Sequence, residues 1–160
     1  GHATIGKAKE DLDRASAAIN TVLSPIGGAA NVSVLKALVT QSSSAIPIMP
    51  LYISLTYKVM KEEGTHEGCI EQLQRLFTEG LYTDTPRLDE HNRLRMDNLE
   101  LRAETQEKSE VLWPQVTEEK LYDISDYKGY NADFLRLFGF GLDGVDYEAD
   151  VSPEVEVNFQ

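Results

Sequence analysis

One segment, Asn31–Thr40 (NVSVLKALVT), constrains the fold more than any other part of the sequence. It is rich in Val and Leu, with Gly27 and Gly28 before it and a polar run after it. It shows little apolar–polar alternation near its end, which is typical of a strand covered on both faces. We therefore predict a strand over Val32–Val39, and a strand of this kind needs neighbouring strands in a sheet.

Helical patterns fill most of the remaining chain. Apolar residues at three- and four-residue spacing predict helices over Gly6–Ser24, Leu51–Glu63, a stretch capped by Thr65, Glu100–Val116 with a bend at Pro114, a start at Thr117–Tyr122, and Asn131–Phe138. Gln41–Ser44 is expected to be a polar loop, and only weak strands are indicated at Leu94–Met96 and Val145–Val151. One clear strand and one or two weak ones are too few for the sheet that a buried strand requires. We therefore expect an α/β fold of which this chain is the end of a larger domain.

The charge balance excludes several classes of partner. The 160 residues suit one domain, and 27 acidic residues against 15 basic ones give a net charge of −12. So acidic a surface repels nucleic acid and anionic membranes.

Cys69 is the only cysteine, which suits a reducing cytoplasm and excludes an intramolecular disulfide. The most apolar stretch, Ala45–Met60, contains two prolines and is shorter than the ~20 residues of a membrane helix.

The familiar catalytic and metal-binding patterns are incomplete. His66, Glu67 and Cys69 form at most half a metal site, because no second Cys/His pair has zinc spacing. The acidic run DGVDYEADV lacks the Gly and the Glu that a calcium loop requires at its sixth and twelfth positions. No G-x-S-x-G or P-loop is present. The string GFGLDG has the spacing G-x-G-x-x-G, but it follows a predicted helix instead of a strand, so we interpret it as a turn and not as a dinucleotide loop. We predict no metal, and a metal-dependent hydrolase is the weakest of the enzyme hypotheses.

Four segments resemble one enzyme family. They are VMKEEGTHEGCIEQLQRLF (Val59–Phe77), LVTQSSSAIPIMPLYISL (Leu38–Leu55), GFGLDGVDYEADV (Gly139–Val151) and TIGKAKEDLD (Thr4–Asp13). The resemblance is to the trans-2-enoyl-thioester reductases of the FabV type, and it runs from Thr4 to about Val151 without large gaps. In that family these stretches belong to a single Rossmann-type domain related to short-chain dehydrogenases.

The resemblance implies that residues 1–160 are the C-terminal fragment of one larger reductase domain. This fragment would carry the active-site helix, the substrate-loop region and the C-terminal helices, whereas the N-terminal dinucleotide-binding half would be absent. The family's catalytic pair is Tyr-(eight residues)-Lys. Lys9 matches the Lys, and the Tyr would fall one position before Gly1.

The implied activity is NADH-dependent reduction of the C2=C3 bond of enoyl thioesters on acyl carrier protein or CoA, in fatty acid synthesis. Lys9 would hold the nicotinamide ribose and favour ionisation of the Tyr. The resemblance also implies contacts to the nicotinamide half of NAD from Leu38, Val39 and Thr40. An apolar wall for the acyl chain would come from Met49, Leu51, Tyr52 and Met60.

The resemblance further implies a cytoplasmic parent enzyme that is a monomer. The isolated fragment is expected to be inactive, and an exposed apolar strand edge would let it self-associate. The alternative hypothesis is a stand-alone acidic helical interaction module without catalysis.

Overall fold

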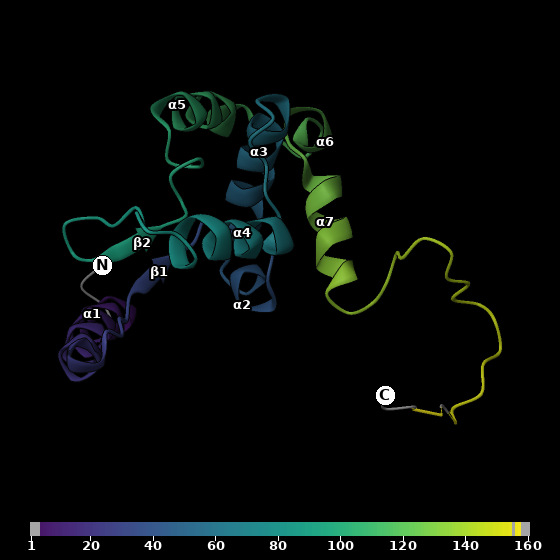
Figure 1. Cartoon of the computed structure of the whole chain (residues 1–160). Helices are drawn as coiled ribbons and strands as arrows, with labels where there is room; N and C mark the ends of the chain where they lie inside the picture. Colours follow the sequence, from purple (N-terminus) through teal and green to yellow (C-terminus); the bar gives the residue numbers. More distant parts are fainter. Residues whose placement is uncertain (1–3, 155, 158–160) are drawn as a thin grey trace.

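A computed structural model describes residues 4–154 and 156–157, and it shows a mostly helical chain around one short sheet (Figure 1). The helices are α1 (Thr4–Leu23), α2 (Gln41–Ser44), α3 (Met49–Glu62), α4 (Cys69–Arg75), α5 (Ala103–Leu112), α6 (Leu121–Ile124) and α7 (Tyr127–Arg136). Single turns of 3-10 or π-helix follow three of them, at η1 (Ser24–Ile26), η2 (Leu76–Leu81) and η3 (Trp113–Gln115). The strands are β1 (Val32–Val34) and β2 (Arg93–Arg95). This confirms the expected α/β fold with few strands.

The sheet is a parallel pair in which Ser33 lies opposite Leu94. Its ladder continues for one more bond, because the N–H of Met96 donates to Val34 O at 2.9 Å. The weak strand expected at Leu94–Met96 is therefore confirmed to within one residue. The strand predicted over Val32–Val39 is wrong beyond Val34, because β2 offers no backbone partner to the residues that follow.

Helix α3 is the centre of the packing, with α5 on one side and α7 on the other (Figure 1). Pro50 lies in its first turn, as expected from the missing N–H of proline, and Gly64 at φ +68° follows its end. Its buried polar residues bond within the helix: Thr56 Oγ1 donates to Tyr52 O at 2.8 Å. A largely apolar helix can therefore bury even its hydroxyl-bearing residues.

Two clusters of buried side chains form the core. The first joins the segment after β1 to α3 and α7, and contains Val39, Ile53, Tyr57 and Tyr130. The second lies between η2 and β2, and contains Leu76, Leu94 and Met96. Gly80 fits beside this second cluster because a Cβ there would come within 3.3 Å of Leu76.

Two local predictions are wrong for reasons of capping. Gln41–Ser44 is helix α2 and not a loop, because the hydroxyls of Thr40 and Ser43 form a capping box at its start. Thr65 does not cap the next helix. Its N–H donates to Met60 O at 2.8 Å and closes α3, whereas α4 begins at Cys69, after a bond from Gly68 N–H to Glu71 Oε2 at 3.0 Å.

The helix predicted over Glu100–Val116 is shorter and ends as Pro114 requires. Helix α5 stops at Leu112, and Pro114 lies in the 3-10 turn that follows. The helix predicted over Asn131–Phe138 begins four residues earlier, because Asp126 caps α7 through a bond from Gly129 N–H at 3.2 Å.

The strand predicted at Val145–Val151 does not form. Gly139, Gly141 and Gly144 all have positive φ, so the chain turns repeatedly instead of extending. The Tyr147 hydroxyl closes these turns by donating to Gly139 O at 2.7 Å. After α7 the chain runs away from the helices (Figure 1). No helix in the described part of the chain is long and apolar enough to cross a membrane.

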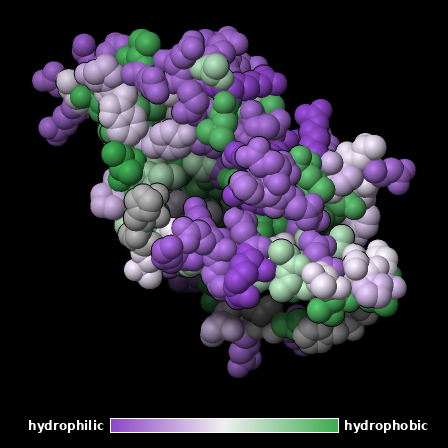
Figure 2. Space-filling model, turned by 90° about the vertical axis from the view of Figure 1, so that its left-hand side faces the viewer, coloured by the Kyte–Doolittle hydropathy of each residue, from purple (hydrophilic) through white to green (hydrophobic). Residues whose placement is uncertain are grey.

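Helix α1 lies apart from the other helices and contacts mainly β1 and η1 (Figure 1). None of its residues is buried, and Val22 is 75% exposed. Further apolar side chains of α1 that remain exposed are Ile5, Leu12 and Ile19. Figure 2 shows hydrophobic side chains reaching the surface between charged ones on this side of the molecule. The amphipathic pattern of α1 thus has an apolar face with little to pack against.

We expect the 160-residue chain, produced alone, to associate as its concentration rises, because the apolar face of α1 is uncovered. Sedimentation velocity at several concentrations, with hydrophobic-dye binding, measures this. Ile19→Glu should weaken the association, whereas Thr21→Glu on the same helix is the matched control. A monomer with low dye binding at every concentration would contradict the expectation.

Candidate functional site

The candidate site is built on the extended segment Leu35–Thr40, which leads from the carboxyl end of β1 to α2. Side chains hold its backbone where a neighbouring strand would normally do so. Lys36 N–H donates to Gln72 Oε1 at 2.9 Å, and Ala37 N–H donates to Glu100 Oε2 at 2.6 Å. Both holding side chains are buried. The segment is therefore fixed although it belongs to no sheet.

Helix α4 supplies the support for this arrangement. Gln72 Nε2 donates to Glu67 Oε2 at 2.7 Å, and Glu67 pairs with Arg75 at 2.5 Å. Arg75 also donates to Met96 O at 2.6 Å, just after β2. The side chains of Glu67 and Arg75 are only 12% and 13% exposed, so solvent screens their attraction weakly.

Lys36, within this segment, is a buried cation. Its ammonium donates to Ala37 O at 3.0 Å and lies 4.6 Å from the centre of the Tyr57 ring. Burial lowers the pKa of Lys36, and the nearby carboxylates of Glu100 and Glu67 oppose this. Burial also raises the pKa of Tyr57, so its hydroxyl stays protonated.

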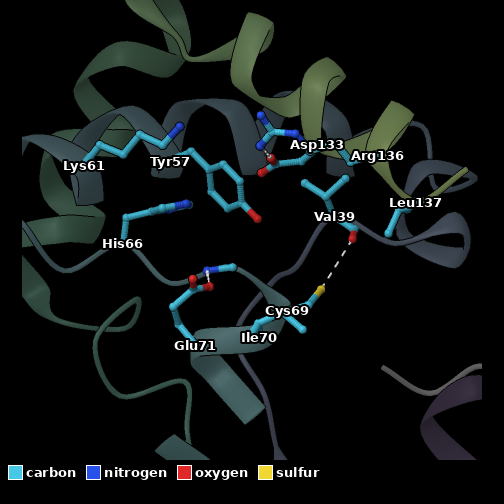
Figure 3. A pocket seen from close by; sticks show the side chains of 11 residues that line it. Val39, Tyr57, Lys61, His66, Cys69, Ile70, Glu71, Asp133, Arg136 and Leu137 are labelled. Atoms are coloured by element: carbon cyan, nitrogen blue, oxygen red, sulfur yellow. Dashed lines mark hydrogen bonds and ion pairs between the residues drawn. The ribbon is translucent and has the colours of Figure 1, made fainter. Parts of the chain in front are cut away.

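A pocket of about 690 Å³ opens next to the segment, between α3, α4 and α7 (Figure 3). Its walls include Val39, Tyr57, Lys61, His66, Cys69 and Asp133. The Tyr57 hydroxyl points into it, and the Cys69 thiol donates to Val39 O at 3.7 Å (Figure 3). Burial raises the pKa of the Cys69 thiol, which disfavours the reactive thiolate.

His66 packs edge-on against Tyr57, with the ring centres 4.3 Å apart. Its Nδ1 is buried and has no hydrogen-bond partner. Burial is the main reason why its pKa falls below 6.5, and the positive charges of Lys36 and Lys61 add to this. Within residues 4–154 and 156–157, no three His, Cys, Asp or Glu side chains are grouped so that they could hold a metal ion.

A second hollow, of about 470 Å³, lies between the start of α3 and the chain around α6. It is lined by Pro47, Pro50, Leu51, Val116, Thr117, Glu118, Leu121 and Tyr127. It is mainly apolar and contains no basic side chain, so it suits a hydrocarbon group better than an anion.

The structure brings together some of the residues singled out in the sequence and separates others. Val39 is in the core, and Met49 and Tyr52 pack against its cluster. Thr40 caps α2, and Leu38 O accepts the Ser43 hydroxyl at 2.7 Å.

The other residues singled out in the sequence lie elsewhere. Leu51 lines the second hollow, whereas Met60 has no exposed surface. Lys9 is exposed on α1 and lines neither the pocket nor the second hollow.

Sequence reasoning missed the residues that hold the segment, namely Lys36, Gln72 and Glu100. One signal was present: Lys36 interrupts an otherwise apolar run, and a charge in a buried run needs a partner. No local pattern identifies Glu100, which lies 63 positions from the residue it binds.

Comparisons with known proteins agree on one family. The family profile described as the trans-2-enoyl-CoA reductase catalytic region matches residues 1–82, and the one described as the enoyl reductase FAD binding domain matches residues 88–151. The chain belongs to the trans-2-enoyl-CoA reductase family.

Relatives support this membership along the chain. An enoyl-(acyl-carrier-protein) reductase (NADH) of Saccharophagus degradans is 72% identical over 100% of this chain and 40% of its own length. One from Idiomarina loihiensis is 63% identical over 97% of this chain and, again, 40% of its own length. The chain thus spans about 40% of these curated relatives.

Solved structures confirm the fold. The trans-2-enoyl-CoA reductase of Clostridium acetobutulicum in complex with NADH superimposes with a TM-score of 0.88 at 49% identity, over 93% of this chain and 38% of that one. The Treponema denticola enzyme in complex with NAD gives 0.85 at 45% identity, over 92% and 37%.

The residues present do not fit FAD, despite the name of the second profile. Residues 88–151 contain sixteen acidic side chains and seven basic ones, an unfavourable balance for a pyrophosphate. Arg93 and Arg95 already pair with Asp89, at 3.0 and 3.5 Å. The glycine-rich string GFGLDG in this stretch follows helix α7 and not a strand, so it lacks the strand–turn–helix setting of dinucleotide-binding folds. No part of the proposed chemistry therefore depends on a flavin.

The segment after β1 does fit a nicotinamide cofactor. In open α/β sheets, ligands bind beyond the carboxyl ends of parallel strands. Leu38–Thr40 follow the carboxyl end of β1, which is paired in parallel with β2. Val39 lines the open pocket at the same place.

We expect His66→Gln to flatten the pH dependence of stability below pH 6.5. The folded pKa of His66 lies below its ordinary value of 6.5, so on acidification the unfolded chain takes up the proton first. Wild-type stability should therefore fall as the pH drops from 6.5 toward the lowered pKa. Urea midpoints across this range measure it, with His91→Gln, in an exposed loop, as the control. Equal slopes for wild type and His66→Gln would contradict the assignment.

Proposed function

We propose that this chain is part of an NADH-dependent reductase that saturates the C2=C3 bond of trans-2-enoyl thioesters. The observation that carries the proposal is the 72% identity to an enoyl-(acyl-carrier-protein) reductase (NADH) over all 160 residues. The segment Leu38–Thr40, which lies beyond the carboxyl end of the parallel strand β1, supports it, because ligands of open α/β sheets bind in that region.

In this proposal each part of the chain has a defined task. The cofactor supplies the hydride when bound, and the protein supplies orientation and charge. Leu38, Val39 and Thr40 hold the nicotinamide half, in a backbone that Gln72 and Glu100 keep in place. The ammonium of Lys9 holds the ribose and stabilises the ionised form of a tyrosine partner.

The acyl chain takes the apolar surface at the start of α3. Met49 and Tyr52 pack against the cluster of Val39, next to the cofactor segment, and Leu51 extends the apolar surface to the second hollow. Met60, on α3, has no exposed surface and contributes only by packing beneath this wall. A flexible thioether and an aromatic ring suit an acyl chain of variable shape.

We propose acyl carrier protein or CoA as the carrier of the thioester, because the names of the relatives include both. Residues 1–160 are then the C-terminal part of a monomeric, cytoplasmic enzyme. A stand-alone interaction module is not favoured, because the identity to the reductases extends through the whole chain.

The first expectation is that a protein with the full length of the relatives oxidises NADH in the presence of crotonyl-CoA, whereas the 160-residue chain alone does not. The chain spans about 40% of the relatives, and its one G-x-G-x-x-G string follows a helix instead of the strand that a dinucleotide loop requires. Absorbance at the NADH band measures both. Turnover by the chain alone, above that of its Lys9→Ala variant, would sink the expectation.

Lys9→Ala in the full-length protein should lower kcat/KM by roughly 10² or more, from lost ribose placement and lost support for tyrosine ionisation. Lys7→Ala is the matched control, because Lys7 pairs with Glu10 at 2.8 Å on the exposed side of α1. Steady-state kinetics on both variants decide: equal losses would show that Lys9 has no special role.

A further inference from the structure

The carboxylate of Glu100 contacts both candidate ligand-binding elements at once. Oε2 accepts the N–H of Ala37 at 2.6 Å, and Oε1 accepts the Tyr52 hydroxyl at 2.5 Å. Ala37 directly precedes the candidate cofactor residues, and Tyr52 belongs to the candidate acyl wall. The residue itself is only 5% exposed, so both bonds are made away from solvent.

Helix α5 fixes Glu100 from the other side. Gln106 Nε2 donates to Glu100 O at 2.8 Å and to the Tyr52 hydroxyl at 3.2 Å. The Lys36 ammonium lies close enough for its charge to interact with the Glu100 carboxylate. A buried carboxylate with this many partners is held in one position.

We propose that Glu100 is a positioning residue that sets the spacing between the cofactor segment Leu38–Thr40 and the acyl wall at Tyr52. It touches neither ligand and acts through the Ala37 N–H and the Tyr52 hydroxyl. The inference rests on the proposed reductase function. Hydride transfer requires the nicotinamide and the enoyl double bond to be aligned closely, and a shift of about 1 Å can cost on the order of a hundredfold in rate.

Substitutions at Glu100 and at Tyr52 test the two bonds together and one at a time. A glutamine keeps an amide oxygen for the Ala37 N–H, and its NH₂ group can donate to the Tyr52 oxygen. An alanine removes both bonds and leaves the Ala37 N–H buried without an acceptor. Tyr52→Phe removes only the bond on the acyl side. Glu110→Gln, on an exposed position of α5, is the matched control for loss of an acidic charge.

The experiment measures KM for NADH and for crotonyl-CoA, together with kcat, on these variants of the full-length protein. We expect Glu100→Ala to raise both KM values about tenfold. Tyr52→Phe should raise the KM for crotonyl-CoA alone, and Glu100→Gln should restore the KM for NADH to within about twofold of wild type. Amide hydrogen exchange should show faster exchange over Lys36–Thr40 in Glu100→Ala.

A purely structural role predicts a different result. Glu100→Ala would then lose thermal stability while both KM values stayed within about twofold of wild type, and this outcome would overturn the proposal. If Glu100→Ala does not fold, Tyr52→Phe decides: the proposal fails if this variant leaves the KM for crotonyl-CoA unchanged.

Failure of the proposed function looks different again. In that case the wild-type protein neither binds NADH nor reduces crotonyl-CoA. The holding role of Glu100 is then judged by exchange alone, and unchanged exchange over Lys36–Thr40 in Glu100→Ala would overturn it as well.

Discussion

Two hydrogen bonds from the backbone to side chains determine the centre of this structure. They run from the N–H groups of Lys36 and Ala37 to Gln72 and Glu100. A buried N–H without a partner costs about 1–3 kcal/mol, so an extended segment beyond the end of β2 needs acceptors from elsewhere. Helix α4 and the turn before α5 provide them. The chain can therefore stay extended up to Thr40 without a third strand.

The two acceptors bring charged groups into the interior, because Glu100 is itself a carboxylate and Gln72 is held by the ion pair of Glu67 with Arg75. A buried charge is tolerated only when it is paired and hydrogen-bonded. Lys36 meets the Tyr57 ring and the Ala37 carbonyl, and Arg75 meets Glu67 and the Met96 carbonyl. The contact of Lys36 with Tyr57 and that of Arg75 with Met96 join elements that are distant in sequence. Helices α3 and α4, β2 and the segment after β1 are therefore coupled through polar contacts as well as through apolar packing.

Local sequence patterns predict the elements whose formation depends mainly on short-range interactions. The period of α1, the proline at the start of α3 and the β-branched run of β1 were sufficient to find those elements. The apolar run continues to Val39, so the local pattern predicts a longer strand. Nothing local shows that, beyond Val34, side chains take the place of a partner strand. Likewise a family resemblance suggests Val39 and Tyr52 as site residues, whereas Glu100 bonds across 63 positions and has no local signature.

The side chains that hold Leu35–Thr40 can make further contacts that a partner strand could not make. A strand partner constrains every second residue along its length, whereas Glu100 constrains one N–H and leaves its second oxygen free to bond elsewhere. That second oxygen binds Tyr52 on α3. One carboxylate can thus tie the segment Leu35–Thr40 to helix α3 only because the sheet stops at Val34 and the helices close over the remaining residues.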